Sequence, residues 1–474
     1  MSKTWLVEGV GISLACLLSW RSSSPRLRQV LLLISSYLFY AGVAHWFLGV
    51  LVASTLMNYA WGSLLRRRPT AGWLWGGVLL NLLLLGGFKY VPGISASWAQ
   101  MSPFAALTRI AVPVGISFWT FEALSYLFDV YRDQEIDPSL LEFSLYMAFG
   151  PTVLSGPICR LPDMLPQFRE ARSLEWEDLR YGLQRIWLGI FMMMLARTLG
   201  SGLQPGQGVD AGFESTRLGG IDVWLLVIGY GFQLFFDFAG YSHIAIGVAR
   251  LFGFRLPENF NLPYLSTSPS EFWTRWHMSL SFWIRDYVFI PLATARREVW
   301  WRNLSLLISM VIFGLWHKAT LVFVIWGAYH GVLLMFHRLW QQTQRRFGFD
   351  SSGWFFTPIS WLVTFLAICF GWIFFRAPTA EKAFAMSRAA LSPAAYHAPS
   401  FALDYYLVVG ATLAGYFLVS VLRARFGPND ESVFAWIPVE LRSGCYAAML
   451  YLLIFLYLVA FQTAQPHAFI YFQF

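Results

Sequence analysis

Long apolar runs recur along the whole chain, and short polar loops separate them. The hydrocarbon core of a bilayer is about 30 Å thick, and a helix of about 20 apolar residues crosses it. Lipid offers no hydrogen-bond partners, so a spanning segment must satisfy its own backbone, as an α-helix does. We therefore predict an all-α polytopic membrane protein with roughly 11 to 13 transmembrane helices. The candidate ranges are 5–20, 29–44, 46–64, 72–88, 106–127, 140–156, 183–200, 221–238, 303–316, 320–337, 355–375, 400–422 and 445–463.

The composition leaves no room for a large soluble domain. Charged residues make up 13% of the 474 residues and hydrophobic residues 57%, whereas soluble domains carry about 25% charged residues. We expect a single transmembrane domain over residues 1–474. The formal net charge is +8, but most arginines fall in short loops between apolar runs. This placement indicates membrane topology and not nucleic-acid binding.

The arginine-rich loops predict the orientation in the membrane. If successive spans pair as hairpins, these loops fall on one side, which the positive-inside rule makes cytoplasmic. The loop 201–220 and both termini then face the opposite side. The arginine-rich loops are 21–28, 66–68, 275–302, 338–346 and 423–425.

Two stretches do not read as simple spanning helices. Residues 160–185 mix arginines, acidic residues and large apolar side chains, which is typical of a helix in the membrane interface. Residues 239–302 are aromatic and arginine-rich, which together with their interruptions predicts re-entrant or interfacial helices buried in protein. The interruptions are Gly240, Gly253, Pro257, Pro263 and Pro269.

Within the second stretch, Ser268 and Pro269 have the pattern of a helix start, with Glu271 at the capping-box position. We predict a helix over 271–287. On such a helix one polar face collects residues at i, i+4 spacing and the other face is aromatic. An interfacial helix whose arginines meet lipid headgroups is the alternative. The polar face is Trp273, His277, Ser281 and Arg285, and the aromatic face is Phe272, Trp276, Leu280, Trp283 and Tyr287.

Two further histidines lie at or within apolar segments. His317 stands at the junction of two apolar runs, and His330 stands inside the second. Ionisable residues at membrane depth are costly and often functional, and a buried neutral imidazole can act as a general base. A structural histidine remains the alternative for each, and His317 is the stronger catalytic candidate. Structural roles are expected for the other candidate buried charges, Glu122, Asp129, Asp237 and His243.

The sequence lacks several motifs that would indicate other chemistries. The eight histidines form no HxxxH or HxxHH cluster, which argues against a di-iron site. No glycine-rich phosphate loop or GxSxG nucleophile motif is present. We predict no metal site and no permanently bound cofactor.

Ordered motifs spread over nearly the whole chain resemble the membrane-bound O-acyltransferase family, in particular its bacterial alginate O-acetyltransferase-like branch. Such a number of matches in order makes the resemblance specific. The motifs are Ser36–Tyr40, Pro113–Phe118, Leu124–Arg132, Ser155–Ile158, Phe236–Ser242, Pro257–Asn261, Arg275–Ser281, Ile284–Tyr287, Gly314–His317, Gly371–Arg376 and Phe469–Phe472.

The resemblance implies a ring of membrane helices around a central funnel in a bacterial inner membrane. It implies that His317 and His277 are catalytic, and that acetyl-CoA is the cytoplasmic donor. It also implies a periplasmic acetyltransferase partner protein and a polysaccharide acceptor, which the enzyme reaches directly or through that partner. The family usually has a small residue where this chain has Lys318, whose charge would further disfavour a protonated His317. The substrate-binding candidates are Trp273, Arg275, Ser281, Arg285, Asp286, Trp316 and His330.

The leading hypothesis is an inner-membrane O-acetyltransferase that acts on an exported polysaccharide such as alginate or cellulose. Peptidoglycan O-acetylation and D-alanyl transfer to teichoic acid are close alternatives. A proton-coupled transporter is an alternative of another class, and the lack of an internal repeat disfavours it.

Overall fold

The computed structural model describes most of the chain. The predicted span 5–20 lies outside the described residues except for Trp20, and only scattered positions of the predicted span 445–463 are described. Helices form nearly all the regular structure of this part, and Phe260 and Trp276 form an isolated β-bridge in it. The described residues are Trp20, 24–91, 111–133, 135–170, 175–203, 206–215, 218–348, 353–396, 401–426 and scattered positions between 441 and 454.

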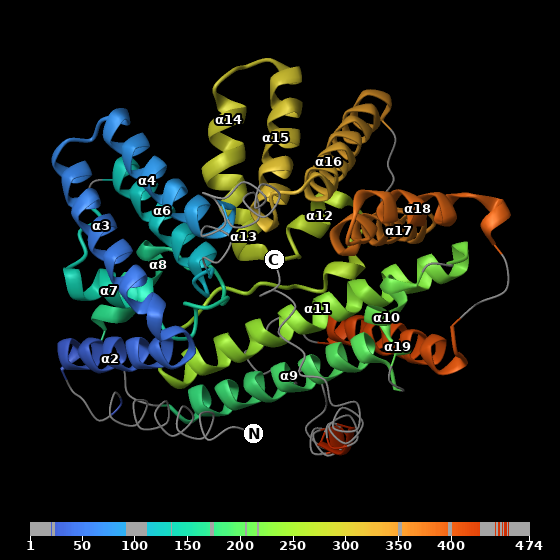
Figure 1. The fold of residues 1–474 in the computed structure, drawn as a ribbon, viewed down its shortest axis with the longest axis horizontal. Helices are drawn as coiled ribbons and strands as arrows, with labels where there is room; N and C mark the ends of the chain where they lie inside the picture. Colours follow the sequence, from blue (N-terminus) through green and yellow to red (C-terminus); the bar gives the residue numbers. More distant parts are fainter. Residues whose placement is uncertain are drawn as a thin grey trace, which may run out of the picture. The chain divides into compact units, whose positions relative to one another are not determined.

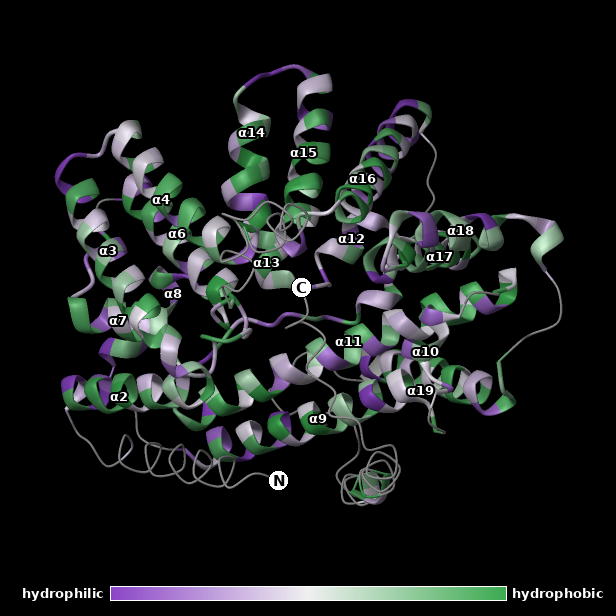
Figure 2. Ribbon diagram, viewed as in Figure 1, coloured by the Kyte–Doolittle hydropathy of each residue, from purple (hydrophilic) through white to green (hydrophobic). Residues whose placement is uncertain are grey.

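Seven stretches of the described residues are helices long and apolar enough to cross a bilayer, which confirms an all-α polytopic membrane protein. The loops between α3 and α4 and between α14 and α15 are hydrophilic (Figure 2). The prediction of a helix ring around a funnel stays a prediction, as does the total of 11 to 13 spans. The seven stretches are Pro25–Arg67, Ala71–Lys89, Gly220–Leu251, Val299–His317, Leu321–Phe347, Phe356–Arg376 and Leu403–Arg423.

The helices belong to two compact units, which are described separately. The first unit comprises Met1–Ile186 and Ala245–Glu258, and the second comprises Trp187–Ile244 and Asn259–Phe474. Figure 1 labels the helices in chain order. The first unit holds α2 (Pro25–Ala44), α3 (Leu48–Arg67), α4 (Ala71–Lys89), α6 (Ile116–Arg132), α7 (Leu140–Ala148) and α8 (Leu161–Arg169).

Buried polar side chains tie helices of the first unit together. Asn58 of α3 and Asn81 of α4 are fully buried and exchange side-chain hydrogen bonds of 3.1 and 2.7 Å. Such a pair satisfies two amides that lipid could not hydrogen-bond.

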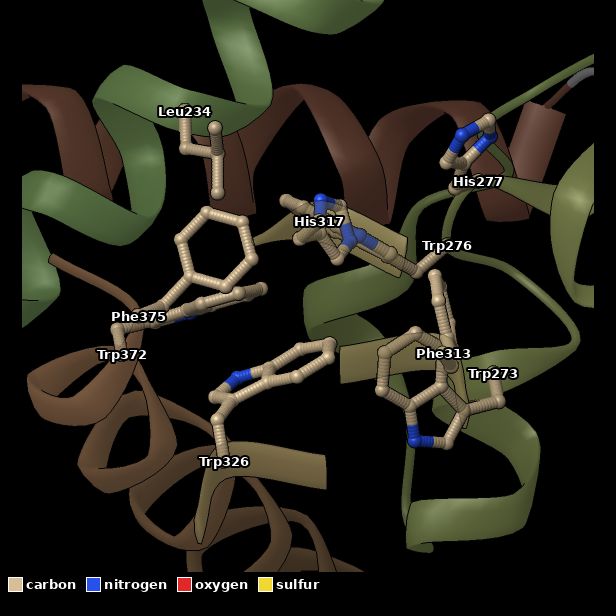
Figure 3. A pocket seen from close by; sticks show the side chains of 9 residues that line it. All are labelled: Leu234, Trp273, Trp276, His277, Phe313, His317, Trp326, Trp372 and Phe375. Atoms are coloured by element: carbon tan, nitrogen blue, oxygen red, sulfur yellow. The ribbon is translucent and has the colours of Figure 1, made fainter. Parts of the chain in front are cut away.

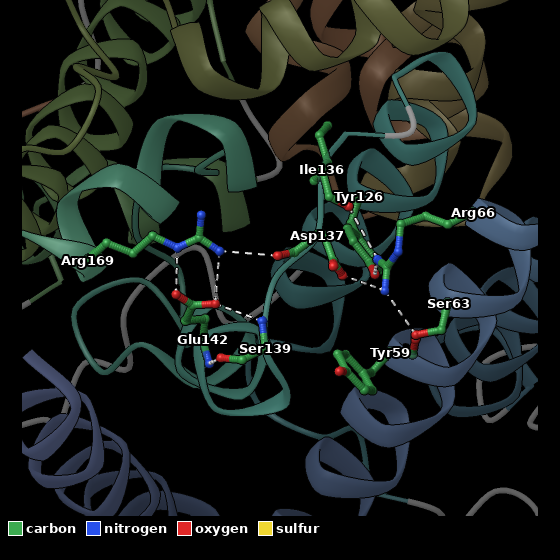
Figure 4. Close-up of polar contacts among 9 residues, drawn as sticks. All are labelled: Tyr59, Ser63, Arg66, Tyr126, Ile136, Asp137, Ser139, Glu142 and Arg169. Carbon is green, nitrogen blue, oxygen red and sulfur yellow. Dashed lines mark hydrogen bonds and ion pairs between the residues drawn. The ribbon is translucent and has the colours of Figure 1, made fainter.

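Arginines bind the ends of several helices in the same unit (Figure 4). Arg66 donates to the Tyr126 hydroxyl at 3.1 Å and forms a 2.9 Å ion pair with Asp137. Arg169 forms a 2.7 Å ion pair with Glu142 at the start of α7. Burial alone would raise the pKa of Glu142, but the hydrogen bonds from Arg169 and Ser139 outweigh it and lower that pKa.

The predicted span 140–156 is wrong. The helix α7 ends at Ala148, and the chain from Phe149 to Arg160 is not helical. Nine residues of helix extend only about 14 Å, half of a bilayer core. Pro151 explains the stop, because proline lacks the backbone N–H and disfavours helical geometry in the residue before it.

The second unit contains the helices that follow in the chain. It holds α10 (Val209–Glu214), α12 (Pro269–Trp273), α13 (Met278–Ile284) and α14 (Ile290–Thr294), along with α15 (Val299–His317), α16 (Leu321–Phe347), α17 (Phe356–Arg376), α18 (Ala380–Leu391) and α19 (Leu403–Phe426). The long helices α9 (Trp176–Ser201) and α11 (Gly220–Leu251) contribute residues to both units.

Gly240 does not interrupt the helix, contrary to the sequence prediction. The helix α11 continues past Gly240 to Leu251. A Cβ atom at Gly240 would lie 2.7 Å from the backbone oxygen of Gly189 in α9. The glycine therefore allows two helices to approach closely, as small residues do in membrane proteins.

The predicted continuous helix 271–287 is also wrong. Ser268 caps α12 as predicted, since its side chain accepts from the Glu271 backbone N–H at 3.2 Å, but α12 ends at Trp273. His277 has a positive φ of 42°, and α13 begins only at Met278. A left-handed residue cannot continue a right-handed helix. The polar face expected from i, i+4 spacing therefore does not form.

Two glycines hold α15 and α16 together as a tight antiparallel hairpin. A Cβ atom at Gly314 would lie 2.2 Å from the backbone oxygen of Phe323, and one at Gly327 would lie 2.3 Å from that of Met310. The short turn from Lys318 to Thr320 joins the two helices. His317, the last residue of α15, is thus placed by this hairpin.

We expect Gly327→Ala to destabilise the protein. The new methyl would overlap backbone that cannot move away as a flexible side chain could, at a cost of about 1 to 3 kcal/mol, which exceeds the helix propensity that alanine adds. Gly86→Ala in α4 is the matched control, because no atom lies within 4 Å of its Cβ position. Thermal unfolding of detergent-purified protein measures both. Equal melting temperatures for the two variants would contradict the close contact.

Candidate functional site

A pocket in the second unit is lined by aromatic side chains and two histidines (Figure 3). It contains about 250 Å³ of space not filled by atoms, part of it open. Helices α11, α12, α15, α16 and α17 and the break between α12 and α13 all contribute to it. The lining residues are Leu234, Trp273, Trp276, His277, Phe313, His317, Trp326, Trp372 and Phe375.

His317 is enclosed by aromatic rings. Its side chain is buried, and its ring centroid lies 4.5 Å from that of Trp316, 4.9 Å from that of Phe375 and 5.4 Å from that of Phe313. Trp326 meets the imidazole edge to face at 5.6 Å. The surroundings of the His317 ring are therefore largely aromatic.

His277 lies in the backbone break between α12 and α13. Its ring is buried and packs edge to face on Phe238 at 4.5 Å. Its Nδ1 atom lies 3.4 Å from the side-chain oxygen of Asn259. His277 lies outside the membrane-spanning helices, and burial lowers its pKa to about 3.

Asn259 organises the backbone around His277. Its side-chain oxygen accepts from the Ser279 hydroxyl at 2.6 Å, and its backbone oxygen accepts from the Met278 N–H at 2.9 Å. Its amide nitrogen donates to the Ser242 hydroxyl of α11 at 3.0 Å. These bonds anchor the start of α13 directly after His277, whose left-handed conformation a non-glycine residue rarely adopts.

Three of the other candidate residues lie in or beside the pocket. Trp273 lines it, and Trp316 packs against His317. His330 is fully buried behind the lining, with its ring 5.2 Å from Trp273 and 4.9 Å from Trp326.

The remaining candidates do not line the pocket. Arg275 forms a 2.7 Å ion pair with Glu271, and the Ser281 hydroxyl donates to the backbone oxygen of Trp276 at 2.9 Å. Arg285 pairs with the adjacent Asp286 at 2.7 Å and is half exposed. The expected placement of Ser281 and Arg285 assumed a continuous helix, and the break at Thr274–His277 changes the direction of every side chain after it.

The other buried-charge candidates, Glu122, Asp129, Asp237 and His243, are also absent from the lining. Lys318, which follows the motif histidine, is exposed and does not line the pocket either. Its ammonium group therefore has access to solvent or headgroups.

Sequence reasoning missed most of the aromatic lining. It did not single out Phe313, Trp326, Trp372 or Phe375 as site residues, although Trp372 and Phe375 fall within the quoted motif Gly371–Arg376. Asn259 falls in another quoted motif, Pro257–Asn261. Aromatic residues are so frequent in this chain that composition could not distinguish a pocket wall from a lipid-facing surface.

The arrangement suits base-assisted group transfer in a dry site. A neutral imidazole can take a proton from a hydroxyl, and an aromatic enclosure keeps water from competing as a nucleophile. The two histidines reach one pocket from different segments of the chain.

Comparison with known proteins agrees with this chemistry. Residues 88–377 match the membrane-bound O-acyltransferase family. The chain is 38% identical over 384 residues to a probable alginate O-acetylase of Pseudomonas aeruginosa, covering 78% of this chain and 71% of that protein.

Two relatives have other acceptors in their names. A peptidoglycan O-acetyltransferase of Helicobacter pylori is 32% identical over 398 residues, covering 76% of this chain and 73% of that protein. A teichoic acid D-alanyltransferase of Bacillus subtilis is 30% identical over 323 residues, covering 65% of this chain and 79% of that protein. The chain therefore belongs to the membrane-bound O-acyltransferase family and is a multi-pass membrane O-acyltransferase.

Proposed function

We propose that this enzyme takes an acetyl group from acetyl-CoA on the cytoplasmic side of a bacterial inner membrane and delivers it for O-acetylation of an exported polysaccharide. The observation that carries this proposal is the pairing of His317 and His277 in one buried aromatic pocket. The relative named as a probable alginate O-acetylase supports an alginate-like acceptor, and a cellulose-like polymer is proposed as the alternative. A periplasmic acetyltransferase partner completes the transfer to the polymer, and nucleic acid has no role.

In the proposed reaction His317 is the general base. Its neutral imidazole takes the proton of the acceptor hydroxyl as that oxygen attacks the thioester carbonyl carbon. The carbon–sulfur bond then breaks, the acetyl group stays on the acceptor oxygen, and coenzyme A leaves as the thiol after taking up a proton. The apolar pocket protects the thioester from hydrolysis.

His277 is proposed to act as a neutral positioning group. Its low pKa prevents it from carrying a proton at physiological pH, and its hydrogen bond with Asn259 fixes its orientation. The arginines near the α14–α15 loop and at the end of α16 are proposed to attract the phosphates of the donor. Arg296, Arg297 and Arg302 are exposed there.

Peptidoglycan O-acetylation is the second candidate function, because the Helicobacter pylori relative bears that name. D-alanyl transfer to teichoic acid is a third, and it requires a different thioester donor. Mass spectrometry of envelope polysaccharides from cells with and without the protein separates these functions, because each predicts a lost acyl group on a different polymer.

We expect His317→Gln to abolish acetyl transfer while the protein is inserted normally and still binds acetyl-CoA. Loss of a general base lowers the rate of the catalysed reaction by a factor of about 10² to 10⁴. The measurement is acetylation of the polymer, with His45→Ala as the control because His45 is exposed in the other unit. A His317→Gln protein of normal abundance that kept more than about a tenth of the rate would rule out this role.

We expect His277 to make the folded protein less stable in mild acid. The pKa of His277 is about 3 in the folded protein and about 6.5 in the unfolded chain. Its contribution to the free energy of unfolding is therefore fully present above pH 6.5 and is lost as the pH falls toward 3. His277→Asn removes this titration and keeps a residue that tolerates the left-handed backbone. The wild-type melting temperature should therefore fall more than that of the variant between pH 7 and pH 5. Parallel curves would contradict the neutral buried imidazole.

We propose that both termini face the periplasm and that the arginine-rich loops face the cytoplasm. Reporter fusions after Arg67, Gly206 and Arg345 test it. We expect cytoplasmic signals at Arg67 and Arg345 and a periplasmic signal at Gly206. A periplasmic signal at Arg67 or Arg345 would overturn the proposed orientation.

A further inference from the structure

The proposed reaction leaves one hydrogen-bond donor of the pocket without a task. Trp326 of α16 lines the pocket and is 1% exposed. Its indole nitrogen is buried and has no hydrogen-bond partner among the described residues. A buried indole N–H usually has a partner, and it can only donate. The Trp326 N–H is therefore available to an oxygen atom of a ligand in the pocket.

Trp326 is well placed relative to the proposed base. Its ring meets the His317 ring at a right angle, with 5.6 Å between the ring centroids. Figure 3 shows the Trp326 nitrogen on the edge of the indole that faces Trp372 and Phe375, which also line the pocket. Trp273 also has a buried nitrogen without a partner among the described residues. In the same view that nitrogen lies on the edge of its ring that points away from His317.

The Trp326 side chain is held firmly in this position. Its ring centroid lies 5.9, 5.7 and 5.2 Å from those of Trp273, Phe313 and Phe375. The backbone of the next residue, Gly327, is held against α15 by the close contact described above. A hydrogen-bond donor that is already fixed in place needs no reorganisation when charge develops beside it.

Thioester transfer creates a negative charge that needs such a donor. When a hydroxyl attacks the carbonyl carbon, the carbonyl oxygen becomes an oxyanion. As that oxyanion returns to a carbonyl, the carbon–sulfur bond breaks, and the leaving thiolate takes the proton that the base removed from the hydroxyl. The base and the hydrogen-bond donor serve two oxygens on one carbon, so their side chains must lie side by side, as those of His317 and Trp326 do.

We propose that the indole N–H of Trp326 donates a hydrogen bond to the carbonyl oxygen of the thioester and stabilises the oxyanion that forms there. This makes Trp326 a catalytic residue. The inference rests on the proposed acetyl transfer and names the group that activates the thioester. It is independent of the acceptor that finally carries the acetyl group.

Infrared spectroscopy of bound acetyl-CoA tests the hydrogen bond directly. The probe is acetyl-CoA with a ¹³C-labelled carbonyl, bound to the full-length His317→Gln protein in lipid nanodiscs. A hydrogen bond to a carbonyl oxygen lowers its stretching frequency. We therefore expect the carbonyl band to move to higher frequency when Trp326→Phe is added to His317→Gln. Trp283→Phe is the matched control and should leave the band in place, because Trp283 is 4% exposed in the same unit and does not line the pocket.

Release of coenzyme A by proteins that retain His317 tests the role in catalysis. We expect Trp326→Phe to lower kcat about 10²- to 10³-fold, the effect of losing one oxyanion donor. The affinity for S-ethyl-coenzyme A, a thioether without a carbonyl, should stay within about threefold of the wild type. Trp283→Phe should leave kcat within about threefold of the wild type.

A second variant separates the lost N–H from lost packing. Site-specific replacement of Trp326 by 3-benzothienylalanine exchanges the N–H for sulfur and keeps the shape of the ring. It should keep the wild-type melting temperature, because the Trp326 N–H has no partner among the described residues, and it should lower kcat as Trp326→Phe does. A wild-type kcat in this variant would overturn the proposal. So would a carbonyl band that Trp326→Phe leaves unchanged, or an absence of acetyl-CoA binding.

The same measurements distinguish this inference from the proposed function. If coenzyme A release depends on His317 while the carbonyl band and kcat are insensitive to Trp326, the transfer function stands and the role of Trp326 is wrong. If the carbonyl band depends on Trp326 while release is insensitive to His317, the role of Trp326 stands and the base assignment is wrong.

Discussion

A bilayer supplies no hydrogen-bond partners, so each polar group at membrane depth must find one within the protein. This constraint explains why Asn58 and Asn81 pair with each other, and why buried arginines such as Arg185 meet carboxylates.

The same constraint shapes the chemistry of the pocket. The imidazole proposed as the general base, that of His317, is surrounded by the rings of Trp316, Phe375 and Phe313. Neutrality is what a general base requires before it takes a proton. The pocket could not be built by one helix, since a single helix presents only a stripe of side chains. Here the glycine contacts of α15 and α16 bring two helices close enough to enclose His317 on several sides.

At the break at His277 a local rule predicts the wrong backbone, although two residues of the predicted face line the pocket. Helical spacing predicted one face carrying Trp273, His277, Ser281 and Arg285. Bonds from Asn259, which lies outside the predicted helix, instead stabilise a left-handed residue at position 277. Trp273 and His277 reach the pocket on the two sides of the break, whereas Ser281 and Arg285 do not. At Gly240 the local rule fails in the opposite way: a glycine predicted to interrupt the helix lies inside the continuous helix α11, where it allows close packing against α9.

The sequence by itself determined that the chain is an all-α membrane protein, where most of its long helices lie, and that His317 ends an apolar segment. These properties follow from hydrophobicity summed over about 20 residues, a local quantity that does not depend on distant contacts. Only the tertiary structure decided that α7 stops short, that the chain breaks at His277, and which aromatic rings line the pocket. Each of these depends on contacts between residues far apart in the chain, or on a proline or hydrogen bond whose local effect outweighs the average hydrophobicity.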